Sequence, residues 1–256
     1  MATASGSARD ADRVHVEVIS DFACPWCYVG KARLDAAIEA FVRSSSSPDD
    51  GANTRVHVSF RPYMIDPRTK LDGEEYLAYN KRRWGDGWTA SLKRSSRKDG
   101  CEFSKWVTWP NSLLAHRLQK FADDAGKGAQ VNNLVFQTIY ERGGNASDLE
   151  TLVSLAGEAG LSAADARAYL TSRDGEEDVL REDHWAKDEL GVTGVPCFVV
   201  RVAGGRTNPD AAATATASGI VGVDSLDGGR GQSKIVLNGA VAPDDLLRAF
   251  ENIRRM

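Results

Sequence analysis

Two cysteines separated by two residues form the strongest chemical signal in this chain. The segment reads Cys24, Pro25, Trp26 and Cys27. The thiolate is the reactive form of cysteine, and a Cys-x-x-Cys pair at a helix start has a lowered thiol pKa because the helix N-terminus favours an anion. Cys24 lies just before the expected helix, and Cys27 lies one turn inside it. The spacing therefore predicts that Cys24 attacks a disulfide and that Cys27 resolves the intermediate.

A zinc half-site and a pair of structural cysteines are the two alternative interpretations of this segment. A structural zinc site takes four ligands, typically from a second Cys-x-x-Cys or a pair of histidines. The other candidate ligands are scattered along the chain: Cys101, Cys197, His15, His57, His116 and His184. We therefore favour redox chemistry, and we expect no metal site and no tightly bound cofactor.

The elements around the cysteine pair indicate an α/β sheet. Residues 14–19 alternate apolar and polar side chains, which predicts a strand with one buried face. Residues 28–43 have helical spacing, and Pro25 suits the first helical position because its missing N–H is not needed there. Residues 55–60 alternate again. The cysteine pair is thus expected where a strand leads into the helix of a strand–helix–strand unit.

The middle of the chain has a helical pattern, and the strand pattern returns near residue 195. A β-rich run follows Pro196, residues 234–238 predict a short strand, and residues 242–254 predict a C-terminal helix. The expected central helices cover 112–124, 131–142, 148–159, 162–171 and 176–190.

Taken in order, these pieces resemble the DsbA-like thioredoxin family, and its FrnE-type branch is the best match. That family is related to 2-hydroxychromene-2-carboxylate isomerase and kappa-class glutathione transferase. The resemblance covers about residues 14–255, and it is carried by residues 21–30, 111–118, 139–145, 194–196 and 237–240. It implies an α/β thioredoxin fold with a large all-helical insertion between the second strand and the cis-proline strand. The expected division is a disordered tail (1–13), a thioredoxin-fold domain (14–70 and 176–256) with a flexible loop (203–232), and the insertion (71–175).

The resemblance also implies a substrate-binding surface. Val195-Pro196 would be a cis peptide facing Cys24, and Pro25, Trp26, Val195 and Pro196 would contact the substrate. From the residues alone, Pro196 merely opens a strand, where proline is tolerated. Cys197 departs from the branch, which usually has a bulky residue there. Strand alternation favours a buried Cys197 over an additional redox partner.

Several other residues have competing interpretations. Asp21 is of a type that caps helices, although tuning of Cys24 is an alternative, and His116 is expected to be structural. Cys101 is expected to be a free thiol.

The insertion contains four tryptophans: Trp84, Trp88, Trp106 and Trp109. They either fill the core of the insertion, which we favour, or line a groove beside Cys24. Residues 81–98 are strongly basic, with Asp86 as the one acid. Their basic side chains predict a solvated face or an anion site for glutathione carboxylates. The basic residues are Lys81, Arg82, Arg83, Lys93, Arg94, Arg97 and Lys98.

Composition excludes some classes of protein. Hydrophobic residues make up 42% of the 256 residues, enough for a substantial core, and the formal net charge is −4. This balance does not indicate nucleic acid or an anionic membrane as a partner. The N-terminal residues contain no apolar stretch of the secretory type, so we expect a cytoplasmic protein. We also expect a monomer or a homodimer.

The predicted function is thiol–disulfide exchange with protein or peptide substrates, with glutathione as a candidate co-substrate. One alternative is a glutathione-dependent isomerase or transferase acting on small aromatic or polyketide-like molecules. Those related enzymes usually have serine where this chain has Cys24, so the presence of both cysteines argues against that alternative. A second alternative is a chaperone-like binding module that uses the apolar surface around Cys24.

Overall fold

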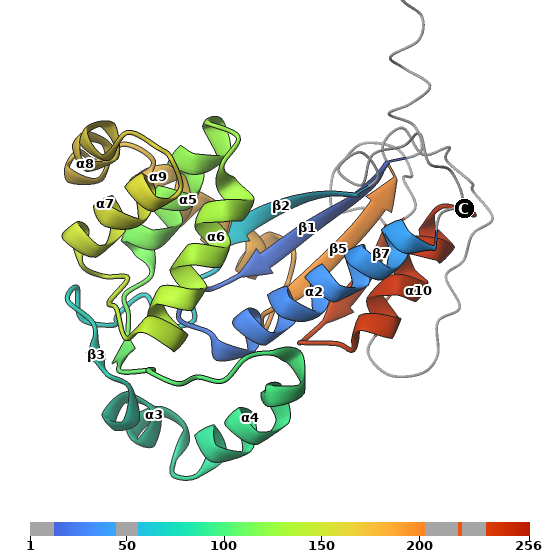
Figure 1. The fold of residues 1–256 in the computed structure, drawn as a ribbon, viewed down its shortest axis with the longest axis horizontal. Coiled ribbons are helices and arrows are strands. Elements are labelled where there is room, and N and C mark those ends of the chain that lie inside the picture. The colour runs from blue at the N-terminus through green and yellow to red at the C-terminus, as the bar shows by residue number, and fades with distance from the viewer. Residues whose placement is uncertain (1–12, 45–55, 203–219, 222–233) are drawn as a thin grey trace, which may run out of the picture.

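The computed structural model describes residues 13–44, 56–202, 220–221 and 234–256. Most of the expected tail and of the expected loop 203–232 lies outside the described residues. Figure 1 shows one sheet with helices packed against it and a larger group of helices beside it. In the described part of the chain, no helix is long and apolar enough to cross a membrane.

The sheet has five strands in the order β2-β1-β5-β7-β6. β1 pairs with β2 in parallel and with β5 in antiparallel orientation, and β7 is antiparallel to both β5 and β6. This order places β1 in the interior, directly before the cysteine pair. The strands are β1 (Val14–Ser20), β2 (Val56–Pro62), β5 (Cys197–Val202), β6 (Ile220–Val221) and β7 (Lys234–Asn238).

Helices cover both faces of the sheet, so its strands alternate between two apolar clusters. α2 (Pro25–Arg43) and α10 (Pro243–Ile253) lie side by side on one face, where Phe41 meets Phe250 at 5.6 Å between ring centroids. Phe198 and Val200 of β5 point into that cluster. Cys197 and Val199 point to the opposite face, as strand alternation requires.

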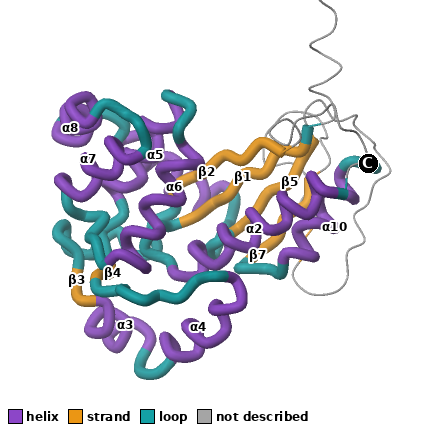
Figure 2. The backbone as a smooth tube through the Cα atoms, viewed as in Figure 1, coloured by secondary structure: helices purple, strands orange, loops and turns teal. Residues whose placement is uncertain are grey.

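The insertion between β2 and β5 is mostly helical, as Figure 2 shows. Asp148 and Ser162 accept hydrogen bonds from backbone N–H groups three residues on, which explains where two of its helices begin. Between β2 and β5 lie the helices α3 (Tyr76–Trp84), α4 (Trp88–Ser96), α5 (Leu113–Asp124), α6 (Gly128–Gln137), α7 (Leu149–Glu158) and α8 (Ala163–Thr171), and then α9 (Glu176–His184), which follows the expected end of the insertion. A 3₁₀ turn (Arg97–Asp99) and π-helical segments (Thr138–Arg142 and Trp185–Glu189) complete this part of the chain.

The expectation of an all-helical insertion was wrong in one respect. β3 (Glu74–Glu75) pairs in antiparallel orientation with β4 (Thr108–Trp109). Two residues are too few to show an alternating pattern, and the pairing joins segments more than thirty residues apart in the chain. This small ladder and an Arg33–Asp99 ion pair of 2.8 Å hold the α3–α4 segment next to α2.

Candidate active site

The cysteine pair lies at the N-terminus of α2, where the sequence predicted it. Cys24 is the N-cap residue with an extended backbone, and Pro25 occupies the first turn. The carbonyl oxygen of Cys24 accepts from the N–H of Cys27 at 3.0 Å. The first turn contains no acidic residue, so the positive end of this 19-residue helix faces the cysteine pair without a carboxylate in that turn.

The two thiols lie in different environments. Cys24 is 5% exposed and Cys27 is 2% exposed, whereas Trp26 between them is 36% exposed. Burial raises the pKa of the Cys27 thiol well above its ordinary value, and hydrogen bonding to Cys24 and the charge of Cys24 add to this. Hydrogen bonds with the Asp21 backbone and the Ser20 side chain act in the opposite direction. Cys27 is therefore held as a protonated thiol at neutral pH.

The loop before β5 packs against the start of α2. The Val195–Pro196 peptide bond is cis, the isomer that the resemblance implied. The Sγ atom of Cys24 lies 3.6 Å from the carbonyl oxygen of Val195. Gly30 makes this approach possible, because a Cβ atom on Gly30 would lie 2.7 Å from Cγ of Pro196. The sequence did not reveal this role for Gly30, since it depends on a residue more than 160 positions away.

Asp21 is buried directly before the cysteine pair. Its Oδ1 accepts from the N–H of Ala23 at 3.0 Å, and its Oδ2 accepts from the N–H of Ile65 at 2.7 Å. Nε2 of His116, also buried, lies 3.6 Å from Oδ1 of Asp21. The carboxylate therefore fixes the turn into α2 and the segment after β2. The sequence indicated a turn or cap role for Asp21 and a structural role for His116, but it gave no sign that the two side chains meet.

A cavity of about 560 Å³ opens beside Cys24, and we call it the Cys24 cavity. Of the four cysteines, all of which the structure describes, Cys24 alone lines it. The walls come from the start of α2, the segment after β2, the α3–α4 region, β4 and the loop before β5. The lining residues are Cys24, Pro25, Trp26, Tyr63, Ile65, Arg83, Trp84, Trp88, Trp109, Thr193, Gly194 and Val195.

The four tryptophans of the insertion divide between the two roles that the sequence left open. Trp84, Trp88 and Trp109 line the Cys24 cavity, and Trp109 is at the same time buried in the core, the role favoured for all four. Trp106 is buried and packs against Tyr76 at 4.5 Å between ring centroids. Of the predicted contact residues, Pro25, Trp26 and Val195 line the cavity, and Pro196 is buried behind them against Gly30.

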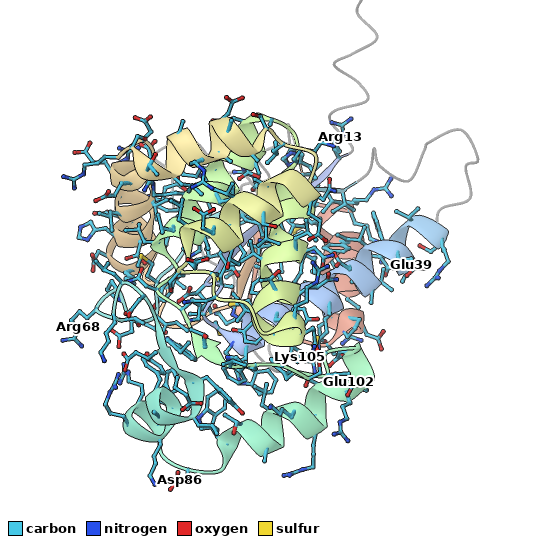
Figure 3. All side chains as sticks on the ribbon, turned by 60° about the vertical axis from the view of Figure 1, so that its left-hand side comes forward. Arg13, Glu39, Arg68, Asp86, Glu102 and Lys105 are labelled. Carbon is cyan, nitrogen blue, oxygen red and sulfur yellow. The ribbon has the colours of Figure 1, made fainter. Side chains whose placement is uncertain are left out.

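The basic residues at 81–98 do not form a single cluster. Arg82 pairs with Glu74 at 2.6 Å, and Arg97 pairs with Glu102 at 3.6 Å. Asp86 points outward from the turn between α3 and α4 (Figure 3), 3.8 Å from Lys81. Arg83 is the member of the set that lines the Cys24 cavity. An anion site beside Cys24 would therefore depend on Arg83 rather than on the whole run.

The two remaining cysteines are buried away from the Cys24 cavity. Cys197 lies in the apolar cluster with Ile19 and Tyr63, and burial raises its pKa to about 11. Cys101 is buried in the larger cluster, where burial and nearby acids raise its pKa to about 12. Both are free thiols. Within the described residues, no cluster of three His, Cys, Asp or Glu side chains is arranged to hold a metal ion.

The fold and the site together define a class: thioredoxin-fold proteins with a Cys-x-x-Cys pair at a helix N-terminus and a cis-proline loop beside the first cysteine. Residues 15–229 match the family model of the DsbA-like thioredoxin domain. The chain belongs to this family.

Several known proteins are similar to this chain. The uncharacterized protein YwbO of Bacillus subtilis is 30% identical over 190 residues, which are 73% of this chain and 86% of YwbO. The crystal structure of a probable DsbA oxidoreductase from Streptomyces coelicolor has a TM-score of 0.66 at 24% identity, covering 94% of this chain and 90% of that one. A 2-hydroxychromene-2-carboxylate isomerase structure has a TM-score of 0.53 at 16% identity, covering 72% of this chain and 84% of that one. The two structural likenesses show the fold.

Proposed function

We propose that this protein is a thiol–disulfide oxidoreductase that exchanges disulfides with protein or peptide substrates through Cys24 and Cys27. One observation carries the proposal: Cys24 lines an open cavity, whereas Cys27 is buried behind it with a raised pKa. Two-step exchange needs an attacking thiol that a substrate can reach through a cavity and a resolving thiol that is protected behind it.

The proposed reaction has two steps. The Cys24 thiolate attacks one sulfur of a substrate disulfide, and the other substrate sulfur leaves as a thiolate that takes up a proton. Cys27 then loses its proton and attacks the Cys24 sulfur, which forms the Cys24–Cys27 disulfide and releases the second substrate thiol. The reverse sequence oxidises a substrate dithiol, and glutathione could serve as the small thiol partner in either direction.

Variants of single cysteines test this proposal with insulin as a disulfide-bonded substrate. We expect Cys24→Ser to abolish exchange and Cys27→Ser to accumulate a covalent Cys24–substrate adduct, detected by intact-protein mass spectrometry. Cys101→Ser is the matched control, because Cys101 is a buried free thiol outside the Cys24 cavity. Exchange that continues in Cys24→Ser would rule the proposal out.

The size of the Cys24 cavity favours a second candidate, a glutathione-dependent isomerase or transferase. Sites for small molecules typically enclose about 300–1,000 Å³, and the isomerase in the comparison shares the fold. The test is glutathione-dependent isomerisation of 2-hydroxychromene-2-carboxylate, the compound in that protein's name. Turnover that persists in Cys27→Ser would support this candidate, because the resolving thiol has no part in it. Membership in the FrnE-type branch and a cytoplasmic location stay predictions from the sequence.

A further inference from the structure

The Cys24 cavity has walls that suit a planar aromatic group. Trp84 lies 5.1 Å from Trp109 and 5.6 Å from Trp88 between ring centroids. Tyr79 stacks on Trp109 at 4.1 Å and supports it from behind. Aromatic pairs contribute about 0.5–1.5 kcal/mol beyond the burial of their area, so rings arranged in this way favour an aromatic occupant over an aliphatic one.

Two tryptophans at this cavity are unusually exposed. Trp84 is 43% exposed and Trp26 is 36% exposed, and both line the Cys24 cavity. Large aromatic side chains of this kind are enriched at binding surfaces. Trp26 also lies two residues after Cys24 in the sequence, so an occupant that covers both rings lies beside the reactive sulfur.

Arg83 supplies a positive charge to the same cavity. Its guanidinium carbon lies 5.7 Å from the centroid of the Trp84 ring, a cation–π arrangement that limits its movement. Arg83 makes no ion pair with any residue that the structure describes, whereas the adjacent Arg82 is paired with Glu74. A guanidinium forms paired hydrogen bonds with a carboxylate. Arg83 therefore offers an unused anion site among the aromatic walls.

We propose that the Cys24 cavity selects disulfides in which a planar aromatic group with an anionic substituent is attached to, or lies next to, the sulfur that Cys24 attacks. This inference rests on the proposed function. The aromatic group would contact Trp84 and Trp88, and the anion would bind Arg83. Counted from the Cys24 thiolate and the Cys27 thiol, reaction with such a disulfide gives the Cys24–Cys27 disulfide, two substrate thiolates and the one proton that Cys27 loses, so electrons, atoms and charge balance.

Two chromogenic aryl disulfides separate charge from ring recognition. The probes are 5,5′-dithiobis(2-nitrobenzoate), which carries carboxylates, and the uncharged 4,4′-dithiodipyridine, each mixed with reduced protein in a stopped-flow instrument. We expect Arg83→Glu to lower the ratio of the carboxylate rate to the neutral rate at least tenfold. Arg94→Glu is the matched control, because Arg94 is an exposed arginine on α4 that does not line the cavity and should leave the ratio within twofold. An unchanged ratio in Arg83→Glu overturns the inference.

A third probe tests the aromatic walls. Trp84→Leu should lower the ratio of the 4,4′-dithiodipyridine rate to the rate with hydroxyethyl disulfide, an aliphatic disulfide, by about threefold or more. Equal losses with both probes would contradict ring recognition. If reduced wild-type protein forms no Cys24–Cys27 disulfide with any of the three probes, the proposed function itself fails.

Peptides then identify the source of the aromatic anion. Two disulfide-linked peptides that differ only in Tyr-Glu against Tyr-Lys beside the cysteine present the same ring with opposite charges. A preference for Tyr-Glu that is lost in Arg83→Glu supports a polypeptide substrate. If Arg83→Glu changes the preference for the anion only with the aryl probes and not with the peptides, the result supports a small aromatic disulfide as the substrate.

Discussion

The Sγ atom of Cys24 lies 3.6 Å from the carbonyl oxygen of Val195, which stands 171 residues further along the chain. This contact joins the start of α2 to the loop that leads into β5. It also brings two walls of the Cys24 cavity together at the reactive sulfur. Residues that control this contact should therefore affect both stability and exchange.

Gly30 is the first of these residues. A methyl group at Gly30 would press against the Pro196 ring at 2.7 Å and against Phe198 at 3.3 Å. We expect Gly30→Ala to lower the free energy of unfolding by about 1–3 kcal/mol, as overpacked cores do. Displacing Pro196 should also slow insulin reduction more than tenfold. Urea unfolding and the exchange assay measure the two effects.

Gly157 provides the matched control for Gly30. It lies in α7, and a Cβ atom added to it would have no atom within 4 Å apart from its chain neighbours and its own helix backbone. Gly157→Ala should raise stability by about 0.5–1 kcal/mol through helix propensity and leave exchange unchanged. If Gly30→Ala behaves like Gly157→Ala, the close packing of Gly30 on Pro196 is refuted.

Asp21 is predicted to be a structural support for the site. Asp21→Asn replaces one carboxylate oxygen by an N–H₂ group, so the N–H of Ala23 or of Ile65 loses its acceptor. A buried donor without a partner costs about 1–3 kcal/mol, which urea unfolding will detect. Asp35→Asn, an exposed member of an i,i+4 ion pair with Lys31, should change stability by less than about 0.5 kcal/mol. Equal effects of the two substitutions would contradict the support role.

Cys197 makes stability depend on alkaline pH. Burial raises its pKa from 9.0 to about 11 in the folded protein. Above pH 9 the unfolded chain loses this proton while the folded chain keeps it, so the unfolded state is favoured as pH rises. Between pH 8 and pH 10 the contribution falls by about 1 kcal/mol. Cys197→Ala removes it.

Urea unfolding with a reductant present measures this effect. The stability difference between wild type and Cys197→Ala should shrink by about 1 kcal/mol from pH 8 to pH 10. Common contributions from lysines and tyrosines cancel in the difference. A difference that stays constant with pH would show that Cys197 titrates as it does in the unfolded chain.

The patterns that repeat locally allowed much of this fold to be predicted. Alternation in residues 14–19 predicted β1, and Pro25 after Cys24 predicted the start of α2. The same alternation correctly predicted that Cys197 is buried. These features depend on neighbours in sequence, and the resemblance to a known family supplied the connection between them.

The features that the sequence did not reveal depend on long-range contacts. Asp21 and His116 are 95 positions apart, and neither residue type indicates the other as its partner. The basic run around Arg83 does not reveal that its neighbour Arg82 is neutralised by Glu74. Composition likewise cannot separate Trp106 in the core from Trp84 at the cavity.

The proposed function requires Cys24 and Cys27 to form a reversible disulfide. Equilibrating the protein in glutathione redox buffers, followed by thiol alkylation and mass spectrometry, tests it directly. We predict one two-electron transition between about −120 and −270 mV, the span from DsbA to thioredoxin, in wild type and Cys101→Ser, and its absence in Cys24→Ser and Cys27→Ser. A stable glutathione adduct on Cys24 in every buffer, with Cys27 remaining a thiol, would show that the two cysteines do not form the disulfide that exchange requires.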